Sequence, residues 1–284
     1  QAVMRYDIDG ACVLLSGASS GIGLELARTL VRDHGCRVIG IARREAKLRA
    51  AEDMINSVAP RAARGGYFGY RIFDVTDPDG WRALAHELED VGIIPDVLIN
   101  NAGVLPPFAR FPLEGGADAV RRVTELNFLS QVYAAEIMLP LIMRSPRGAI
   151  VNVSSSASLC ALPGCAAYSA SKAASRAFTE ALASEYRGRL YITSVCPGFT
   201  KTPIFDQQKP EIAKFLRFSA SPEQMAKKIL RGISRGQSLI IRGADAHAMS
   251  AVYRIAGTAG EGLCASILRI FGGTAFSECF EKTE

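Results

Sequence analysis

Short apolar runs alternate with longer segments of mixed polarity along most of this chain. A run of about six apolar residues between polar ones is typical of a strand buried on both faces of a parallel sheet. The predicted strands occupy residues 11–16, 37–42, 70–73, 95–100, 148–154, 191–196 and 238–241. The segments between them are long enough for helices, so the pattern alternates strand and helix.

The helices predicted between these strands have recognisable starts. Asp77 can cap a helix whose first position is Pro78, and Ser221 with Gln224 has the pattern of a capping box. Pro140 is expected to kink a long helix near its end. Besides the helix that begins at Asp77, the predicted helices occupy 21–33, 43–57, 117–144, 167–186 and 221–234.

This alternation predicts an α/β fold with a doubly wound parallel sheet, the Rossmann fold, because right-handed crossovers place helices on both faces. We expect one domain over residues 1–284, with a substrate loop at 199–220 and a C-terminal extension at 243–284. In such sheets, ligands bind at the carboxyl ends of the strands, where the strand order reverses.

Composition narrows the function. The chain has 284 residues, is 49% hydrophobic and carries a formal net charge of +5, so it can bury a full core. It has no block of Lys and Arg with interleaved aromatic residues, and we expect no nucleic-acid partner. The mild positive charge suits a small polyanionic cofactor.

The cysteines and the lack of long apolar runs bear on the compartment. The seven cysteines are scattered without a CxxC pair, which predicts buried thiols in a reducing compartment. Cys160 and Cys165 are expected in a pocket wall, and the three isolated histidines predict no metal site. No apolar run approaches the roughly 20 residues of a membrane span, and the N-terminus lacks the apolar region of a signal peptide. We therefore expect a cytoplasmic protein with no transmembrane segment.

A glycine-rich turn follows the first strand and opens the first helix. Its glycines are Gly17, Gly21 and Gly23, and they allow the backbone to approach a pyrophosphate at the helix N-terminus. We assign Ser19, Ser20 and Ile22 within this turn to the same phosphate site. The alternative is an ordinary tight turn, but the position between strand and helix favours the phosphate site.

The end of the second strand predicts which nicotinamide cofactor binds. A site for NAD usually places an acid there, to bind the ribose 2′-hydroxyl. This chain has Ala42 followed by Arg43 and Arg44, and guanidinium groups match a phosphate in geometry and charge. We therefore predict NADP(H). The alternative is a pair of solvated arginines.

Two further strand ends are assigned to the cofactor. Asp74 could accept a hydrogen bond from the adenine amino group while Val75 packs on the ring. The alternative, which we favour less, is a turn acid before Asp77. The fourth strand ends in Asn100, and then Asn101, Ala102 and Gly103 follow. Small residues there let the backbone touch the cofactor, and the Asn amides can tie strand ends together.

Four polar residues form the predicted reaction centre. Tyr168 and Lys172 are four residues apart, so on a helix both side chains share one face. A cation one turn away is expected to lower the pKa of the phenol, which would then exchange a proton with a carbonyl oxygen. Ser155 would donate a second hydrogen bond to that oxygen. Asn127 could hold a water that connects Lys172 to solvent.

These motifs resemble those of the short-chain dehydrogenase/reductase family, from about residue 11 to residue 202. The resemblance implies a catalytic tetrad of Asn127, Ser155, Tyr168 and Lys172. It also implies that Pro197, Gly198 and Thr200 or Thr202 contact the nicotinamide amide and phosphate. The family usually has Thr where this chain has Ser16, which keeps the hydroxyl. A homodimer or homotetramer is implied, with the helices carrying Asn127 and Tyr168 at the interface.

The tail resembles particular branches of that family. Residues 221–229, 243–251 and 272–276 are similar to 3-ketosphinganine reductases, and more weakly to hydroxysteroid and bile-acid dehydrogenases. Both substrate classes are large and lipophilic. The apolar tail is either a cover for the substrate pocket or an oligomer interface or core cover, and the sequence leaves these alternatives open. We do not expect it to bind membranes, since its many Gly and Ala residues give a modest apolar face.

The function predicted from the sequence is an NADP(H)-dependent oxidoreductase that interconverts a ketone and a secondary alcohol. The substrate is expected to be lipophilic, such as a long-chain 3-keto base, a steroid or a bile acid. The alternative is a catalytically silent NADPH-binding regulator or redox sensor, against which the complete tetrad argues.

Overall fold

The computed structural model describes residues 5–58, 65–113, 115–217, 219–271 and 279. Its centre is a parallel sheet in the order β3-β2-β1-β4-β5-β6-β7. The predicted fold is confirmed, including the reversal of strand order between β1 and β4. The strands are β1 (Cys12–Ser16), β2 (Arg37–Ala42), β3 (Tyr67–Ile72), β4 (Val97–Asn100), β5 (Ala149–Val153), β6 (Tyr191–Pro197) and β7 (Leu239–Arg242).

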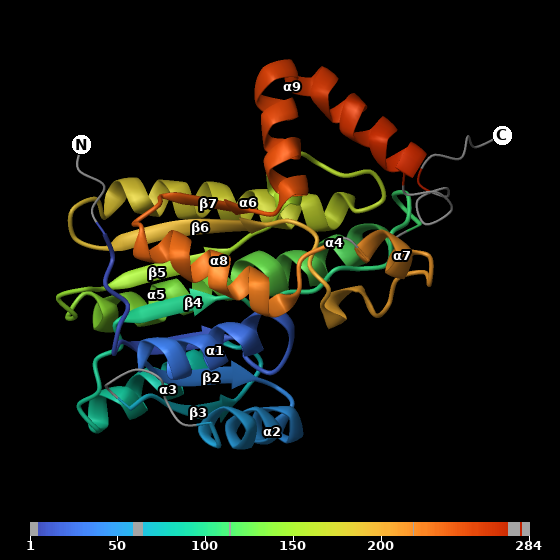
Figure 1. The fold of residues 1–284 in the computed structure, drawn as a ribbon. Coiled ribbons are helices and arrows are strands. Elements are labelled where there is room, and N and C mark those ends of the chain that lie inside the picture. The colour runs from blue at the N-terminus through green and yellow to red at the C-terminus, as the bar shows by residue number, and fades with distance from the viewer. Residues whose placement is uncertain (1–4, 59–64, 114, 218, 272–278, 280–284) are drawn as a thin grey trace.

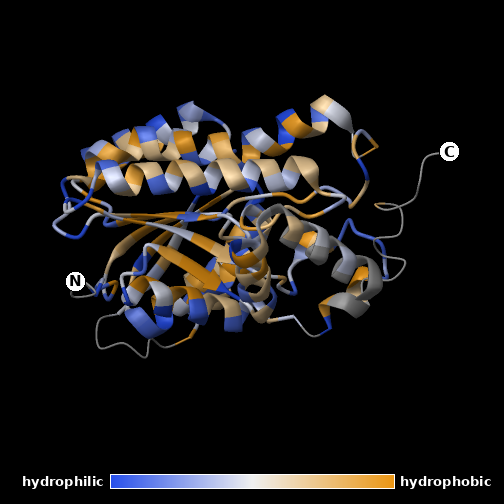
Figure 2. Ribbon diagram, turned by 90° about the horizontal axis from the view of Figure 1, so that it is seen from above, coloured by the Kyte–Doolittle hydropathy of each residue, from blue (hydrophilic) through white to orange (hydrophobic). Residues whose placement is uncertain are grey.

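Helices cover both faces of the sheet (Figure 1). The helices α1 (Gly21–His34), α2 (Glu45–Asn56) and α8 (Pro222–Ser234) pack on one face. On the other face lie α3 (Pro78–Asp90), α5 (Ser130–Ile142) and α6 (Ala166–Glu185). Figure 2 shows apolar strands in the middle and helices of mixed polarity outside them. The sheet is therefore buried on both sides, which explains why its strands read as continuous apolar runs.

The helix starts follow the capping signals in the sequence. The Asp77 carboxylate accepts the N–H of Asp79 at 2.9 Å, with Pro78 at the first position of α3. At the start of α8, the Ser221 hydroxyl accepts the N–H of Gln224, and the Gln224 side chain accepts the N–H of Ser221. Both predictions are confirmed, and each cap satisfies backbone donors that a helix end leaves without intrahelical partners.

The helix predicted at 117–144 is interrupted, which corrects the sequence-based expectation. It consists of α4 (Gly116–Thr124), a wider π-helical turn η1 (Glu125–Leu129) and α5, which ends soon after Pro140. A π turn places one extra residue in the helix and is frequent at functional sites. Here it contains Asn127, a predicted site residue.

The strand predicted at 70–73 also differs in extent. It runs over Tyr67–Ile72, because Tyr67 and Phe68 pair with Arg37 and Val38 of β2. Gly69 interrupts the apolar run in the sequence, so the predicted strand starts at Tyr70. In the structure, the pairing with β2 continues through Gly69.

Beyond β6 the chain makes several short elements before a long helix. A 3₁₀ turn η3 (Pro203–Phe205) and the helix α7 (Ile212–Leu216) lie in the loop at 199–220. After β7, α9 (Ala244–Phe271) leads away from the sheet and bends at Gly257, where the backbone is not helical (Figure 1). The predicted C-terminal extension is thus largely this helix. Its resemblance at 272–276 lies outside the described residues.

Candidate functional site

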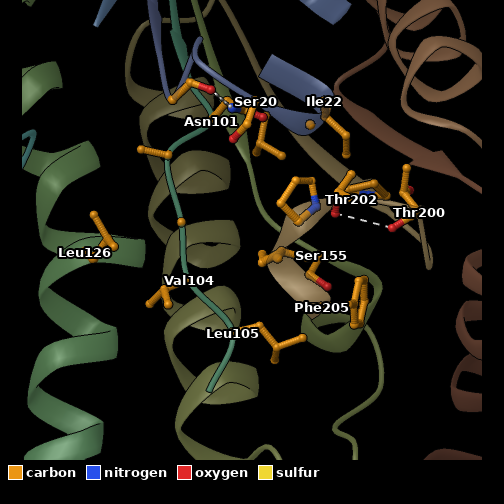
Figure 3. A pocket seen from close by; sticks show the side chains of 18 of the residues that line it. Ser20, Ile22, Asn101, Val104, Leu105, Leu126, Ser155, Thr200, Thr202 and Phe205 are labelled. Atoms are coloured by element: carbon orange, nitrogen blue, oxygen red, sulfur yellow. Dashed lines mark hydrogen bonds between the residues drawn. The ribbon is translucent and has the colours of Figure 1, made fainter. Parts of the chain in front are cut away.

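A pocket of about 510 Å³ opens where the carboxyl ends of the parallel strands meet. In Figure 3, Ser20 and Asn101 lie at one end, Thr200 and Thr202 beside the middle, and Leu105 and Phe205 at the other end. The predicted site residues that line this pocket are Gly17, Ser19, Ser20, Gly21, Ile22, Arg43, Arg44, Asp74, Val75, Asn101, Ala102, Gly103, Ser155, Tyr168, Lys172, Pro197, Gly198, Thr200 and Thr202. Gly23 and Asn127 lie behind its wall.

The turn after β1 has no room for side chains at two of its glycines. Gly17 has a φ of +69°, and a Cβ there would lie 2.9 Å from the Cα of Ala102. A Cβ at Gly23 would lie 2.2 Å from the carbonyl oxygen of Gly17. The first turn of α1 is therefore packed directly on its own entry turn and on the loop after β4. This close packing needs glycine at both positions.

The N-terminus of α1 suits an anion. Ser20 is the N-cap residue of α1, and its side chain makes no capping hydrogen bond. The structure describes the whole first turn of α1, and this turn has no acidic side chain. Its first N–H groups and the positive end of the helix dipole therefore remain available at the pocket. Together with the glycine turn, this fits the pyrophosphate of a dinucleotide.

Hydrogen bonds join this turn to the end of β4. The Ser16 hydroxyl accepts the N–H groups of Asn101 and Ala102 at 3.0 and 3.1 Å. The Asn101 amide in turn donates to the carbonyl of Gly17 at 3.3 Å, and the Asn100 amide donates to Asn152 at the end of β5 at 2.8 Å. The expected role of the Asn amides in tying strand ends together is confirmed.

Three cations gather at the end of β2. Arg43, Arg44 and Lys47 are exposed and line the same end of the pocket. Lys47 was missed by the sequence analysis, although its place three residues after Arg44 on a helix was a usable signal. The cluster supplies donors and positive charge for a phosphate group.

Asp74 is already engaged in this structure. Its carboxylate accepts from the Thr76 N–H and hydroxyl and pairs with Arg43 at 3.2 Å. Burial raises the pKa of Asp74, but the hydrogen bonds from Thr76 and the charge of Arg43 outweigh it and hold that pKa below its usual value. Asp74 therefore orients Arg43 at the pocket, whereas the proposed bond to an adenine amino group stays a prediction.

The helix α6 presents Tyr168 and Lys172 to the pocket, one turn apart. The Lys172 Nζ lies 5.9 Å from the centre of the Tyr168 ring and donates to the Val153 carbonyl at 3.0 Å. The Ser155 hydroxyl is near enough to Tyr168 to lower the pKa of the phenol by hydrogen bonding. The Ser155 oxygen accepts the N–H of Ala157 at 3.2 Å, and the hydroxyl has one proton to donate.

The expected depression of the Tyr168 pKa is wrong for this structure. Burial raises the pKa of Tyr168 to about 12, against a smaller lowering by the Ser155 hydrogen bond. Burial also lowers the pKa of Lys172 to about 8. Desolvation by burial is thus the largest influence on the pKa of both groups. The Lys172 ammonium group is directed at the Val153 carbonyl.

Asn127 fixes the pocket wall from behind. It is fully buried, and its amide accepts the Val104 N–H at 2.8 Å and donates to the Val104 carbonyl at 3.0 Å. Its Nδ2 also donates to Ser171 on α6 at 3.1 Å. A Cβ at Gly103 would lie 3.1 Å from the Asn127 Oδ1 and 3.3 Å from the Lys172 Nζ. The expected water between Asn127 and Lys172 stays a prediction.

The other end of the pocket is mainly apolar. Phe199 and Phe205 have ring centres 5.9 Å apart, and Asp206 and Gln207 add polar groups. Cys165 lines this end as predicted, whereas Cys160 packs in the same apolar cluster behind it. The further apolar lining residues, none of which was predicted individually, are Val104, Leu105, Phe108, Ala157, Leu162 and Ile204.

The loop at 199–220 closes over this end through Gln208. Its amide donates to the Pro106 carbonyl and accepts the Phe108 N–H, both at 2.8 Å. Met249 of α9 and Cys279 pack against the same apolar cluster without lining the pocket. The C-terminal extension therefore backs the wall. Ile255, further along α9, is 87% exposed.

Among the described residues, no group of His, Cys, Asp or Glu side chains could hold a metal ion. In the same part of the chain, no helix combines the length and the apolar character that a membrane crossing requires.

Comparisons with known proteins agree with the fold. Residues 11–213 match the family model described as short chain dehydrogenase. The chain is 33% identical over 227 residues to the benzil reductase ((S)-benzoin forming) IRC24 of Saccharomyces cerevisiae, which covers 78% of this chain and 80% of that protein.

Solved structures of the same type contain either nicotinamide cofactor. A short-chain dehydrogenase from Sphingobium yanoikuyae in complex with NADPH has a TM-score of 0.72 and 26% identity, covering 91% of this chain and 97% of that one. A short chain dehydrogenase/reductase from Burkholderia phymatum in complex with NAD has a TM-score of 0.77 and 22% identity, covering 88% and 95%. At that identity the second likeness concerns the fold alone.

Proposed function

Because the chain belongs to the short-chain dehydrogenase family, we propose that it transfers hydride between NADP(H) and a ketone or secondary alcohol. One observation carries this proposal: the Ser155, Tyr168 and Lys172 side chains share one pocket with an open glycine turn at a helix N-terminus. A polyanionic cofactor and an acid-base group would then be held in a single cavity.

The residues have distinct roles in this reaction. When bound, the nicotinamide supplies or accepts the hydride. Tyr168 keeps its proton at neutral pH, since burial raises its pKa to about 12, and it donates that proton to the carbonyl oxygen of the substrate. Ser155 donates a second hydrogen bond to the same oxygen. Lys172 and Asn127 hold the adjacent backbone of Val153 and Val104 in place.

The preference for NADP(H) rests on the cations after β2. Arg43, Arg44 and Lys47 would surround the 2′-phosphate, and Ala42 stands where an acid would repel it. A charged hydrogen bond of about 1.5–3 kcal/mol corresponds to roughly 10- to 150-fold preference.

A lipophilic substrate is supported by the far end of the pocket. Apolar side chains from the loop after β4, from α6 and from the 199–220 loop surround it. We propose that residues 1–284 act as one domain, in which the 199–220 loop selects the substrate and the C-terminal extension from 243 backs it. Burying a large apolar ketone there would release its hydration water.

We also propose that the protein is a homodimer or homotetramer. An apolar groove of about 260 Å³ lies between α5 and α6, lined by residues such as Ala135, Leu139, Phe178 and Leu182. A second copy could pack on these helices, which continue from the segments that carry Asn127 and Tyr168. A monomeric mass by light scattering at micromolar concentration would contradict this.

The test of the function is NADPH oxidation by the purified protein across a panel of ketones. The panel contains 3-ketosphinganine, keto-steroids, keto-bile acids, benzil and small aliphatic ketones. Tyr168→Phe is expected to lose about 100- to 10,000-fold in kcat while still binding NADPH. Tyr67→Phe is the matched control, because its hydroxyl pairs with Glu52 on the surface.

The outcomes separate the two candidate functions. Turnover of a lipophilic ketone that is lost in Tyr168→Phe and kept in Tyr67→Phe supports the proposal. Tight NADPH binding without turnover of any ketone would favour a silent regulator or redox sensor. Preference for small polar ketones would contradict the lipophilic substrate alone.

A further inference from the structure

Asp245, in the first turn of α9, reaches across to the turn that follows β6. Its Oδ2 accepts the N–H of Phe199 at 2.7 Å. Two further hydrogen bonds hold this turn: the Gly198 N–H donates to the Arg242 carbonyl at the end of β7 at 2.7 Å, and the Thr200 hydroxyl donates to the Gly198 carbonyl at 3.0 Å. Asp245 thus links the C-terminal extension directly to this turn.

Two glycines make room for the carboxylate. A Cβ at Gly198 would lie 2.2 Å from one Asp245 oxygen and 2.3 Å from the other. A Cβ at Gly243 would lie 2.5 Å from the Oδ1. The carboxylate is therefore packed between the turns that follow the neighbouring strands β6 and β7. Such close packing on both sides fixes its orientation toward Phe199.

The turn that Asp245 holds borders both halves of the pocket. Pro197 and Gly198 line it beside the reaction centre, whereas Phe199 packs in the apolar cluster with Phe205. Movement of the Gly198–Phe199 peptide would shift both walls at once. A hydrogen bond to a charged acceptor is among the stronger restraints on a peptide group.

We propose that Asp245 is a positioning residue, which fixes the Gly198–Phe199 peptide so that the cofactor wall and the apolar substrate wall keep their relative placement. This role rests on the proposed function. It makes the first turn of the C-terminal extension part of the reaction site, although Asp245 is not among the residues that line the pocket.

The first experiment measures amide hydrogen exchange in the ligand-free protein by mass spectrometry. Asp245→Ala is expected to speed exchange at least about tenfold in the peptide that spans 197–205, because the Phe199 N–H loses a charged acceptor. Asp245→Asn keeps an acceptor oxygen and should exchange nearly as slowly as the wild type. Unchanged exchange in Asp245→Ala would overturn the proposal.

Glu223→Ala provides a matched control. Glu223 also lies in the first turn of a helix, α8, but its carboxylate pairs with Lys227 on the surface at 2.8 Å. Its loss should leave exchange at 197–205 unchanged. If both alanine variants speed exchange there equally, general loosening explains the result and the proposal is wrong.

The second experiment measures turnover of the best ketone from the panel. Asp245→Ala is expected to lower kcat/KM by roughly 10- to 100-fold. The affinity for NADPH should fall and the KM for the ketone should rise. Asp245→Asn should recover most of this loss. In a Phe199→Ala background the further loss from Asp245→Ala should be smaller, since coupled residues are not additive.

Two outcomes would count against this role. Full turnover in Asp245→Ala, or strictly additive losses with Phe199→Ala, overturns the positioning role alone. A wild-type protein that neither binds NADPH nor reduces any ketone overturns the proposed function, and the role falls with it.

Discussion

Tyr168 and Lys172 show how burial sets the protonation of single residues. Burial raises the pKa of Tyr168 to about 12 and lowers that of Lys172 to about 8. From sequence, the four-residue spacing placed both groups on one helix face. It could not show that Lys172 would be directed at the Val153 carbonyl, because that depends on the end of a strand distant in sequence.

Replacing Lys172 by Met should stabilise the protein at neutral pH. The folded-state pKa of Lys172, about 8, lies below the usual 10.5. At pH 7 the folded protein therefore contains a buried cation that lowers its stability. The free energy of unfolding of the wild type rises between about pH 8 and 10.5, as that cation is neutralised. The free energy of urea unfolding of Lys172→Met is expected to exceed that of the wild type by about 1–3 kcal/mol at pH 7. The gain should shrink by pH 10. An equal gain at both pH values would refute the explanation.

Arg43 offers a second test at this scale. Arg43→Ala should lower the ratio of kcat/KM for NADPH to that for NADH by about 10-fold or more, since a charged donor to the 2′-phosphate is lost. Arg82→Ala, which removes an exposed arginine on α3 that pairs with Asp79, serves as the control. An unchanged cofactor ratio in Arg43→Ala would show that Arg43 does not read the phosphate.

At the scale of elements, features that depend on residues close in sequence were predicted, and features that depend on distant residues were not. Caps at Asp77 and Ser221 depend on neighbours within one turn, and both were predictable. The π turn at Asn127 was not, and the Asn127 amide in this turn bonds to Val104, a partner in another loop that no local pattern indicates. The extent of β3 likewise depends on pairing with β2.

The glycine turn between β1 and α1 yields a prediction at this scale. Gly23→Ala should raise the Kd for NADPH at least about tenfold and lower the unfolding free energy by about 1–3 kcal/mol, because the added methyl meets the Gly17 carbonyl. Gly65→Ala is the control, since a Cβ there meets nothing within 4 Å. The Kd for NADPH is measured by titration calorimetry. An equal Kd in Gly23→Ala and Gly65→Ala would contradict the role of this turn.

At the scale of the whole molecule, the contacts that finish the pocket join distant parts of the chain. Gln208 closes the substrate loop on Pro106 and Phe108, and Asp245 reaches Phe199. Neither residue belongs to a local pattern, so sequence reasoning could not single them out. The sheet and the cofactor end of the pocket were predictable because strand ends and glycine turns carry local signals.

Removing residues after Gly260 tests the C-terminal extension. The deletion takes away Cys279, which packs on the apolar cluster behind the pocket. The KM for a long-chain ketone is expected to rise by roughly fivefold to tenfold, and that for a small ketone by less. Cys279→Ala in the full chain should give part of the effect. Equal changes for both ketones would favour a role in packing alone.

The strand order has a consequence for synthesis on the ribosome. During synthesis, β2 and β3 follow β1 and extend the sheet on one side of it. The other edge of β1 pairs only with the later strand β4, where Val13 pairs with Val97. Until that strand emerges, Cys12–Ser16 has an unpaired edge. Such an edge can pair with another nascent chain. The same reversal of strand order that creates the cofactor pocket therefore makes the partly synthesised chain prone to aggregation.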